Sequence, residues 1–405
     1  MKPDESLLAL ENPYGYRGNA IYLWDYCFYN EKYYVYFGVA PVILFYFPIY
    51  FLSFANYIPT YIFINYFCLI IASGYSILTL YRFYKHFSKN FNVFLFIICC
   101  IAMFAGGGYF LLALAEPMYN TPLLVATTAM FIMYYNCIKG IENNNKLSFA
   151  IMSLSFIIIL SSIPNLCFSV FPLLVLLLPY LFNKNFKKSL INLLPCFITL
   201  FIGVVLVGLY NYFRFGSFVD FGANYQLTVS DVSKNQIKWS NLLPSYYYYF
   251  FQKPIINDKF PYILINLKDI KSFELGYYVY TYPTIGLFTI PLSFCMFLGL
   301  FNLKDKKYLI MNIIFILNIL VLAFVEFSLA GVHLRYMMDL LPMVTFISLL
   351  NILIINELIK SDKIKFIYFV IILIVIIISI IMFISLNANF SYDIEKLLEN
   401  FTMKS

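Results

Sequence analysis

The stretch Tyr29–Pro48, YNEKYYVYFGVAPVILFYFP, begins polar and aromatic and becomes apolar without an intervening polar turn. The apolar part, residues 39–57, approaches the ~20 residues that an α-helix needs to cross a bilayer. Pro41 and Pro48 interrupt it, and a proline inside a helix removes a backbone hydrogen bond and disturbs the turn before it. Whether this segment crosses a membrane decides on which side every later loop lies.

The composition is that of a membrane protein. Of the 405 residues, 62% are hydrophobic and 12% are charged, whereas a soluble domain carries about 25% charged residues. We therefore predict an all-α polytopic membrane protein with about ten transmembrane helices, near residues 58–80, 93–114, 120–138, 147–163, 165–182, 190–211, 283–302, 308–329, 335–357 and 365–387. The net charge of +7 is typical of basic cytoplasmic loops and gives no indication of a nucleic-acid partner.

Basic residues are concentrated in alternate loops between these spans, which hold about half of the 27 Lys and Arg residues. The turns at Glu116 and Pro164 hold none, and basic loops stay in the cytoplasm. A full crossing by 39–57 would put the basic sequence YRFYKHFSKN outside. We therefore predict that 39–57 is interfacial or re-entrant and shielded by protein. An ordinary first helix, with inverted topology for all the later helices, is the alternative.

This topology divides the chain into five regions. They are an external loop with an interfacial or re-entrant hydrophobic segment (1–57), a six-helix transmembrane region (58–211), a long external loop region (212–282), a four-helix transmembrane region (283–387) and a polar C-terminal tail (388–405). Long loops in compact proteins are usually functional. Because the first region is placed outside, we expect either a short translocated tail or a chain that lacks its natural first transmembrane helix.

Three segments resemble those of one enzyme group. They read LLALENPYGYRGNAIYLWDYCFYNEKYYVYFGVAP at 7–41, NYFRFGSFVDFGANYQLT at 211–228 and HLRYMMDLLP at 333–342. In this order they are similar to segments of bacterial membrane glycosyltransferases of the GT-C architecture, relatives of the protein-mannosyltransferase and lipid-sugar transferase families. The resemblance implies a multi-helix enzyme of the bacterial inner membrane that takes a sugar from a polyprenyl-phosphate donor. Its active site would lie at the non-cytoplasmic face.

Two features depart from the pattern of that group. Its first helix precedes the first segment and is followed by an acidic residue often taken as the catalytic base, and that residue has no counterpart here. Many relatives also have an Arg-Pro pair where this chain has Ile163-Pro164. We therefore expect one phosphate-binding cation to be absent or replaced.

Sugar transfer from a lipid phosphate needs a carboxylate that deprotonates or orients the acceptor hydroxyl. We predict Asp25, beside Trp24 in the external loop, or Glu116, an ionisable residue at membrane depth. The alternatives are a solvated or capping aspartate for the first residue and a helix boundary before Pro117 for the second.

Cations stabilise the departing phosphate, and for this role we predict Arg335, Arg214 and Arg17. Arg335 begins a helix on the outer side, where basic residues are disfavoured, and an anionic phosphate accounts for it. The alternatives are a salt bridge from Arg335 to the residue four positions on and, for the other two arginines, an interfacial position near lipid headgroups. The predicted substrate-binding residues are Lys32, Tyr33, Tyr336, Asp339 and His333, and a lone histidine such as the last is more often structural.

The expected acceptor is an external lipid, glycan or protein. The rival class is a transporter or flippase for lipid-linked sugars, but such proteins place polar residues near the bilayer midplane, whereas here they gather at one face. An inactive truncated fragment is the third alternative. The eight cysteines show neither a disulfide framework nor metal-ligand spacing. We predict no metal ligands and leave the participation of a divalent cation open.

Overall fold

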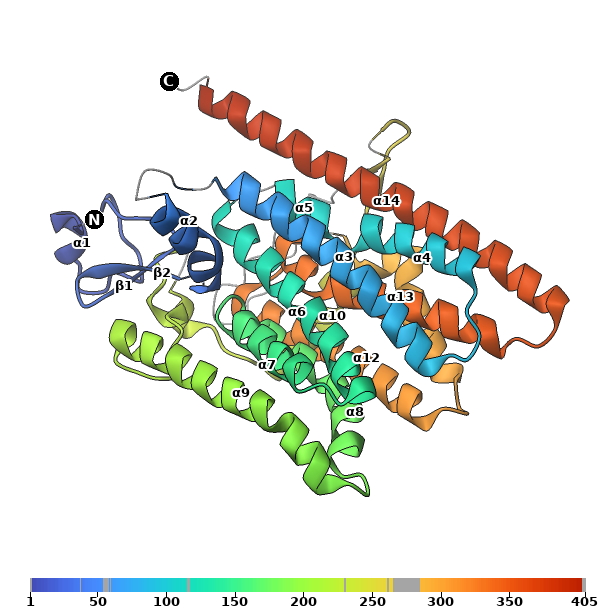
Figure 1. Ribbon diagram of the computed structural model, residues 1–405. Coiled ribbons are helices and arrows are strands. Elements are labelled where there is room, and N and C mark those ends of the chain that lie inside the picture. Colours follow the sequence, from blue (N-terminus) through green and yellow to red (C-terminus); the bar gives the residue numbers. More distant parts are fainter. Residues whose placement is uncertain are drawn as a thin grey trace.

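The computed structural model describes residues 2–36, 38–53, 58, 60–114, 117–228, 231–260, 262–264 and 285–402. In this part the protein is mostly helical, with two short β-hairpins (Figure 1). Among the described residues, seven helices are long and apolar enough to cross a membrane, which supports the predicted membrane-protein class. They are Tyr61–Phe87 (α3), Tyr119–Asn143 within α6 (Pro117–Asn143), Pro164–Leu181 (the 3-10 helix η2, Pro164–Val170, with α8, Phe171–Leu181), Phe186–Phe215 (α9), Lys306–Ala330 (α12), Leu334–Leu358 (α13) and Asp362–Leu386 within α14 (Asp362–Thr402).

The other three predicted spans are shorter helices. They are Val93–Gly106 (α4), Lys146–Leu160 (α7) and Pro291–Phe301, the last made of α11 (Pro291–Phe294) and the 3-10 helix η8 (Cys295–Phe301). A helix of about 15 residues reaches about 22 Å, less than the ~30 Å hydrocarbon core. α4 ends at a glycine run in which Gly108 has φ +75°, and a separate helix, Tyr109–Leu114 (α5), follows. These segments therefore do not form ten full-length spans.

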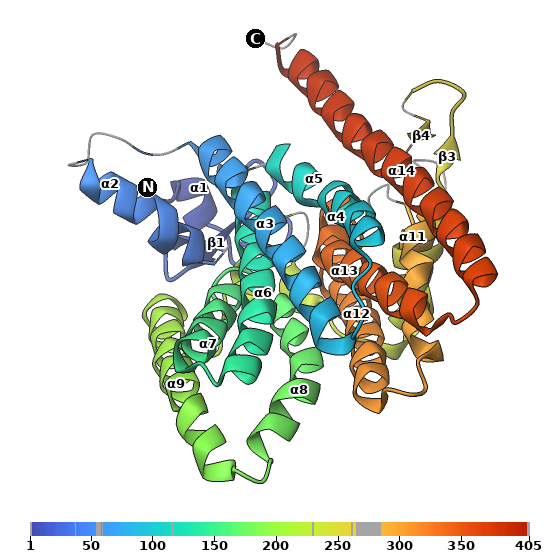
Figure 2. The same cartoon turned by 45° about the vertical axis from the view of Figure 1, so that its right-hand side comes forward.

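The described part of segment 39–57 contains one short helix. A π-helical turn, Val42–Tyr46 (η1), continues into Phe47–Leu52 (α2), and together they reach about 17 Å. Its large apolar side chains are mostly exposed, Leu52 to 76%. Figures 1 and 2 both show α2 beside the N-terminal region. The helix is too short to cross a bilayer, and its position at a membrane interface stays a prediction.

Local sequence explains where the long helices begin and end. The side chains of Thr60 and Asp305 accept backbone N–H groups in the first turns of α3 and α12, as N-caps do. Gly216 and Gly331, with φ of +70° and +88°, end α9 and α12 in conformations that favour glycine. Because only residues 331–333 join α12 to α13, the end of the first lies beside the start of the second.

The two most enclosed helices form the centre of the bundle. In the most apolar 18-residue stretch of each helix, 89% of the residues of α6 and 94% of those of α13 are buried, against 17% in α9 and 22% in α14. Figure 2 shows α9 and α14 at opposite outer sides. Phe83 and Phe131 both pack on Phe346 in the core. The ring centroids of Phe83 and Phe346 are 5.2 Å apart, and the planes of the two rings are perpendicular. Such edge-to-face packing suits aromatic rings.

The basic loops meet at one end of this bundle. An ion pair of 2.6 Å joins Arg82 at the end of α3 to Glu142 at the end of α6. The carboxylate of Glu357, at the end of α13, accepts the backbone N–H groups of Lys89 and Asn90 at 3.1 and 3.2 Å. Phe87 also contacts Tyr308 at the start of α12, and Tyr180 near the end of α8 donates to Asn144, so the loops that the sequence places in the cytoplasm share one end of the molecule.

The N-terminal region packs at the other end. It forms a β-hairpin in which Tyr26–Tyr29 (β1) pairs antiparallel with Lys32–Val35 (β2). The two turn residues both have positive φ, as the tightest hairpin turns require. Cys27 also forms an isolated β-bridge with Gln226. The hairpin is thereby joined to the segment that follows α9.

Gly38 lies where the N-terminal region meets the end of α7. A Cβ at this position would lie 1.9 Å from the backbone oxygen of Ser161, the same oxygen that accepts the N–H of Ala40 at 3.1 Å. A backbone oxygen cannot move aside as the end of a flexible side chain can. We therefore expect Gly38→Ala to lower the free energy of unfolding by about 1–3 kcal/mol. Thermal unfolding in detergent measures this.

The matched control is Gly74→Ala in α3, where an added Cβ meets nothing within 4 Å. This change should leave stability unchanged or raise it by about 0.5–1 kcal/mol, because alanine is the better helix former. Equal losses in the two variants would show that Gly38 is not needed for close packing.

Candidate functional site

A cavity of about 550 Å³ lies at the end of the bundle where the N-terminal region packs. Its walls come from the N-terminal loop, the starts of α6 and α13, the ends of α7, α9 and α12, and the segment after α9. Its volume lies within the range typical of small-molecule sites. The polar side chains that line it include Asp25, Tyr119, Asn165, Arg214, Gln226, Glu326, His333, Arg335, Tyr336 and Asp339.

Asp25 is held in place by three contacts. Its backbone has φ +60°, a conformation that aspartate and asparagine tolerate better than most residues, and its N–H donates to the carbonyl of Leu227 at 2.8 Å. The carboxylate accepts hydrogen bonds from the hydroxyl of Tyr119 and from Nε2 of Gln226 at 3.4 Å. At 9% exposure, it is a buried carboxylate oriented by two other segments.

Arg335 lies against the rings of two tyrosines. Its Cζ is 4.1 Å from the ring centroid of Tyr119 and 4.9 Å from that of Tyr336, and Nη2 donates to the Tyr336 hydroxyl at 3.1 Å. Tyr119 therefore contacts both Asp25 and Arg335. The ion pairs between described residues do not include one from Arg335 to Asp339, so the predicted alternative, a salt bridge along the helix, is not formed.

Arg214 lies at the end of α9 and lines another wall of the cavity. Nη1 donates to the carbonyl of Val35 at 3.1 Å and Nη2 to Oδ1 of Asn211 at 2.9 Å. The guanidinium also stacks on Tyr210, with Cζ 4.0 Å from the ring centroid. Two of the three predicted arginines thus line the same cavity as Asp25.

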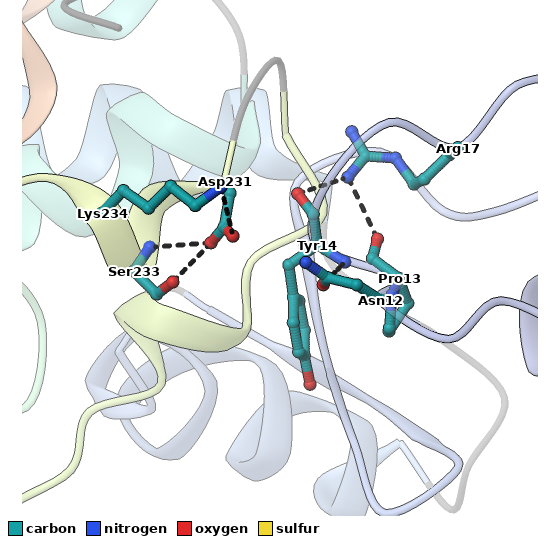
Figure 3. Close-up of polar contacts among 7 residues, drawn as sticks. All are labelled: Asn12, Pro13, Tyr14, Arg17, Asp231, Ser233 and Lys234. Carbon is teal, nitrogen blue, oxygen red and sulfur yellow. Dashed lines mark hydrogen bonds and ion pairs between the residues drawn. The ribbon is translucent and has the colours of Figure 1, made fainter. Parts of the chain in front are cut away.

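Arg17 is placed differently from the prediction. It does not line the cavity, and its guanidinium donates to the carbonyl oxygens of Pro13 and Tyr14, both at 3.2 Å, and of Thr228. Figure 3 shows its contacts with the first two beside the turn that contains Asp231. Because both terminal nitrogens of its guanidinium donate to backbone oxygens, Arg17 joins the N-terminal loop to the segment after α9. It does not present a phosphate site in the cavity.

Two further predicted residues, Tyr33 and Lys32, also lie outside the cavity lining. Tyr33 packs on Phe28, with ring centroids 5.6 Å apart, in the small core of the N-terminal region. Lys32 is exposed at the end of the hairpin. Glu116, the second predicted carboxylate, lies outside the described residues.

Sequence reasoning missed four of the polar lining residues named above: Tyr119, Asn165, Gln226 and Glu326. Glu326, near the end of α12, is 4% exposed and accepts a hydrogen bond from Nδ2 of Asn165 at 2.8 Å. Asp339, near the start of α13, lines the same cavity and is 5% exposed. A lone acidic residue inside an apolar span is itself a signal of function, and this signal could have identified Glu326 in the sequence.

His333 caps α13. Its Nδ1 accepts the backbone N–H of Arg335 at 3.0 Å, and burial, together with the neighbouring guanidinium, lowers the pKa of His333 to about 3. The imidazole is therefore neutral at physiological pH and serves as a hydrogen-bond acceptor. This geometry agrees with the structural role that a lone histidine more often has.

The lowered pKa of His333 makes stability depend on pH. Unfolded histidine takes up a proton near pH ~6.5, whereas the folded protein does so only near pH 3. The contribution of His333 to the free energy of unfolding is therefore fully present above pH ~6.5. It is lost as the pH falls toward 3, by at most about 1.4 kcal/mol per pH unit. We expect a lower melting temperature at pH ~5 than at pH ~7, and a smaller difference in His333→Asn, which keeps a capping oxygen. An equal difference in both proteins would contradict this assignment.

The fold and the cavity define a helical protein of the membrane class with a charged pocket at one end of its bundle. Comparisons of the chain with protein-family models, with curated proteins and with solved structures give no match.

Proposed function

We propose that the protein is an integral membrane glycosyltransferase of the GT-C type. It moves a sugar from a polyprenyl-phosphate donor to an external lipid, glycan or protein. The observation that carries the proposal is the meeting of Asp25 and Arg335 on Tyr119 in one cavity. Such a transfer needs a carboxylate and a cation in contact with the same bound substrate.

In this proposal Asp25 accepts or orients the proton of the acceptor hydroxyl. Arg335 and Arg214, on two walls of the cavity, bind the donor phosphate and stabilise the charge that develops when the sugar leaves. Tyr336, beside Arg335, contacts the headgroup. Arginine suits this task because its planar fork of donors matches phosphate oxygens.

The cavity lies at the end of the bundle opposite to the basic loops, which supports an external site. Single cysteines test the orientation. With the native cysteines replaced, a membrane-impermeant thiol reagent added to intact cells should label Val219→Cys, whose position is 82% exposed beside the cavity's outer segment. It should not label Lys187→Cys, in the first turn of α9 at the basic end of the bundle, until the cells are permeabilised. The reverse pattern would place the cavity in the cytoplasm.

The activity is tested with purified protein in lipid nanodiscs, labelled polyprenyl-phosphate sugars and extracted membrane lipids. Label that moves from the donor to a second molecule supports the transferase. Movement of the intact donor across a vesicle membrane, with no transfer, would instead support a flippase. Absence of both activities across hexose and pentose donors would reject the proposal.

A further inference from the structure

A second hollow in the protein is a groove between α8 and α12, which pack along each other (Figure 2). It has a volume of about 590 Å³ and is lined by η2 and α8 from Phe168 to Pro179 and by α12 from Ile310 to Val321. Among the described side chains that line it, only that of Asn318 is polar, and its Nδ2 contacts Sδ of Met343 at 3.6 Å. The groove therefore offers an almost purely apolar surface.

The groove is open to the surface that lipid covers in a membrane protein. Five of its apolar side chains are between 44% and 53% exposed: Phe171, Leu178, Ile310, Leu317 and Val321. From the first to the last of its lining residues on α12, the helix rises about 16 Å, which is half of the ~30 Å hydrocarbon core. The groove therefore has the depth of one leaflet, and the hydrocarbon chain of a lipid in that leaflet fits it.

The groove lies in the half of the bundle that ends in basic loops. α12 begins at Lys306, and Ile310 follows one turn later on the same face of the helix. α8 ends at Leu181, close after the last groove residue on that helix. The candidate site uses the opposite ends of the same elements, at Asn165 and Glu326. The mouth of the groove therefore faces away from the candidate site.

Exposed lysines flank this mouth on both sides. They follow α8 or lie around the start of α12: Lys184, Lys187, Lys188, Lys304, Lys306 and Lys307. The one acidic residue within 182–190 and 302–308 is Asp305, whose carboxylate caps α12 by accepting the backbone N–H of Tyr308 at 3.0 Å. Lysine side chains extend to the headgroup level of a bilayer, and basic clusters beside membrane helices attract anionic lipids. The charge at the mouth therefore favours a negatively charged headgroup.

We propose that the groove between α8 and α12 binds an anionic phospholipid of the leaflet at the basic end of the bundle. One acyl chain lies in the groove, and the phosphate meets the lysines at its mouth. The polyprenyl chain of a donor is the other lipid chain to consider, but a donor held at Arg335 has its phosphate in the cavity at the opposite end and leaves these lysines without an anion. The inference does not rest on the proposed function, because it uses no residue of the candidate site.

Native mass spectrometry of the purified full-length protein in detergent measures the binding, with phosphatidylglycerol and phosphatidylcholine of the same acyl chains as probes. Phosphatidylglycerol should bind at least about 10-fold more tightly, because each lysine near an anionic headgroup contributes about 5-fold. Lys184→Gln combined with Lys307→Gln should weaken its binding by about 10- to 30-fold and leave phosphatidylcholine binding unchanged. The matched control, Lys363→Gln combined with Lys365→Gln on α14, should change neither.

Photo-crosslinking in nanodiscs locates the lipid chain. Phosphatidylglycerol with a diazirine in its acyl chain should crosslink to α8 and α12. Val321→Trp fills the groove and should remove these crosslinks. Val205→Trp on α9 is the matched control, because Val205 is 42% exposed and Val321 45% but only the second lines the groove, and it should leave the crosslinks unchanged.

Three results would overturn the inference. They are equal affinity for the two phospholipids, the same crosslinks in Val321→Trp as in the wild type, and displacement of phosphatidylglycerol from the groove by polyprenyl phosphate, which would assign the groove to the chain of a donor. Sugar transfer by a protein whose groove takes no phospholipid would reject this inference alone. A bound phospholipid without any transfer would reject only the proposed function.

Discussion

Replacing Asp25 with asparagine is expected to lower the rate of sugar transfer by about 10²- to 10⁴-fold, the contribution of a general base. The change removes the negative charge that Tyr119 and Gln226 orient. It keeps the backbone intact, because asparagine tolerates the φ of +60° at this position. Single-turnover transfer from a labelled polyprenyl-phosphate sugar measures the loss, and thermal unfolding verifies that the variant is folded.

Asp258→Asn is the matched control for this experiment. Asp258 is exposed in a loop and does not line the cavity, so the same chemical change there should leave the transfer rate unaltered. If Asp25→Asn transfers sugar as fast as the wild type, Asp25 is not the base, and the carboxylate must be sought elsewhere in the cavity.

Replacing Arg335 with alanine is expected to lower kcat/KM for the donor by about 10²- to 10³-fold, the effect typical of losing one stabilising donor from a site of developing charge. Arg335→Lys keeps the charge but loses the planar fork and the stacking on Tyr119. It should therefore recover only part of the loss. Steady-state kinetics with varied donor concentration separates an effect on KM from one on kcat.

Arg82→Ala controls for the general loss of an arginine. Arg82 is ion-paired with Glu142 at the end of the bundle that carries the basic loops, and a partly exposed ion pair contributes at most about 1 kcal/mol. Transfer should be unchanged in this variant. A similar fall in both arginine variants would show that the loss in Arg335→Ala reflects damage to the fold.

The helices were the most predictable part of this structure, because apolar length alone identifies them. Among the described residues, seven of the ten predicted spans are helices long enough to cross a membrane, and local features account for shorter ones: α4 ends at Gly106, just before Gly108 with its positive φ. The N-terminal hairpin carried no clear signal, since its turn is Asn30-Glu31 and not the Asn-Gly that favours such turns.

The candidate site was only partly predictable from the sequence. Asp25, Arg214 and Arg335 lie in segments singled out by resemblance, and the structure brings all three to one cavity. Arg17 lay in the same kind of segment, but its guanidinium meets backbone carbonyls, and no residue pattern reveals such partners. Glu326 was missed although a lone acidic residue inside an apolar span is a signal that the sequence carries.

The contacts that build the cavity also determine when it can exist during synthesis. Asp25 and Tyr119 are 94 residues apart, and Asn165 and Glu326 are 161 apart. While α13 is still inside the ribosome, Asp25 and Tyr119 can already meet. Arg335, at the start of α13, cannot yet stack on Tyr119. The finished pocket therefore appears only after α13 has left the ribosome, and shorter nascent chains have no competent pocket.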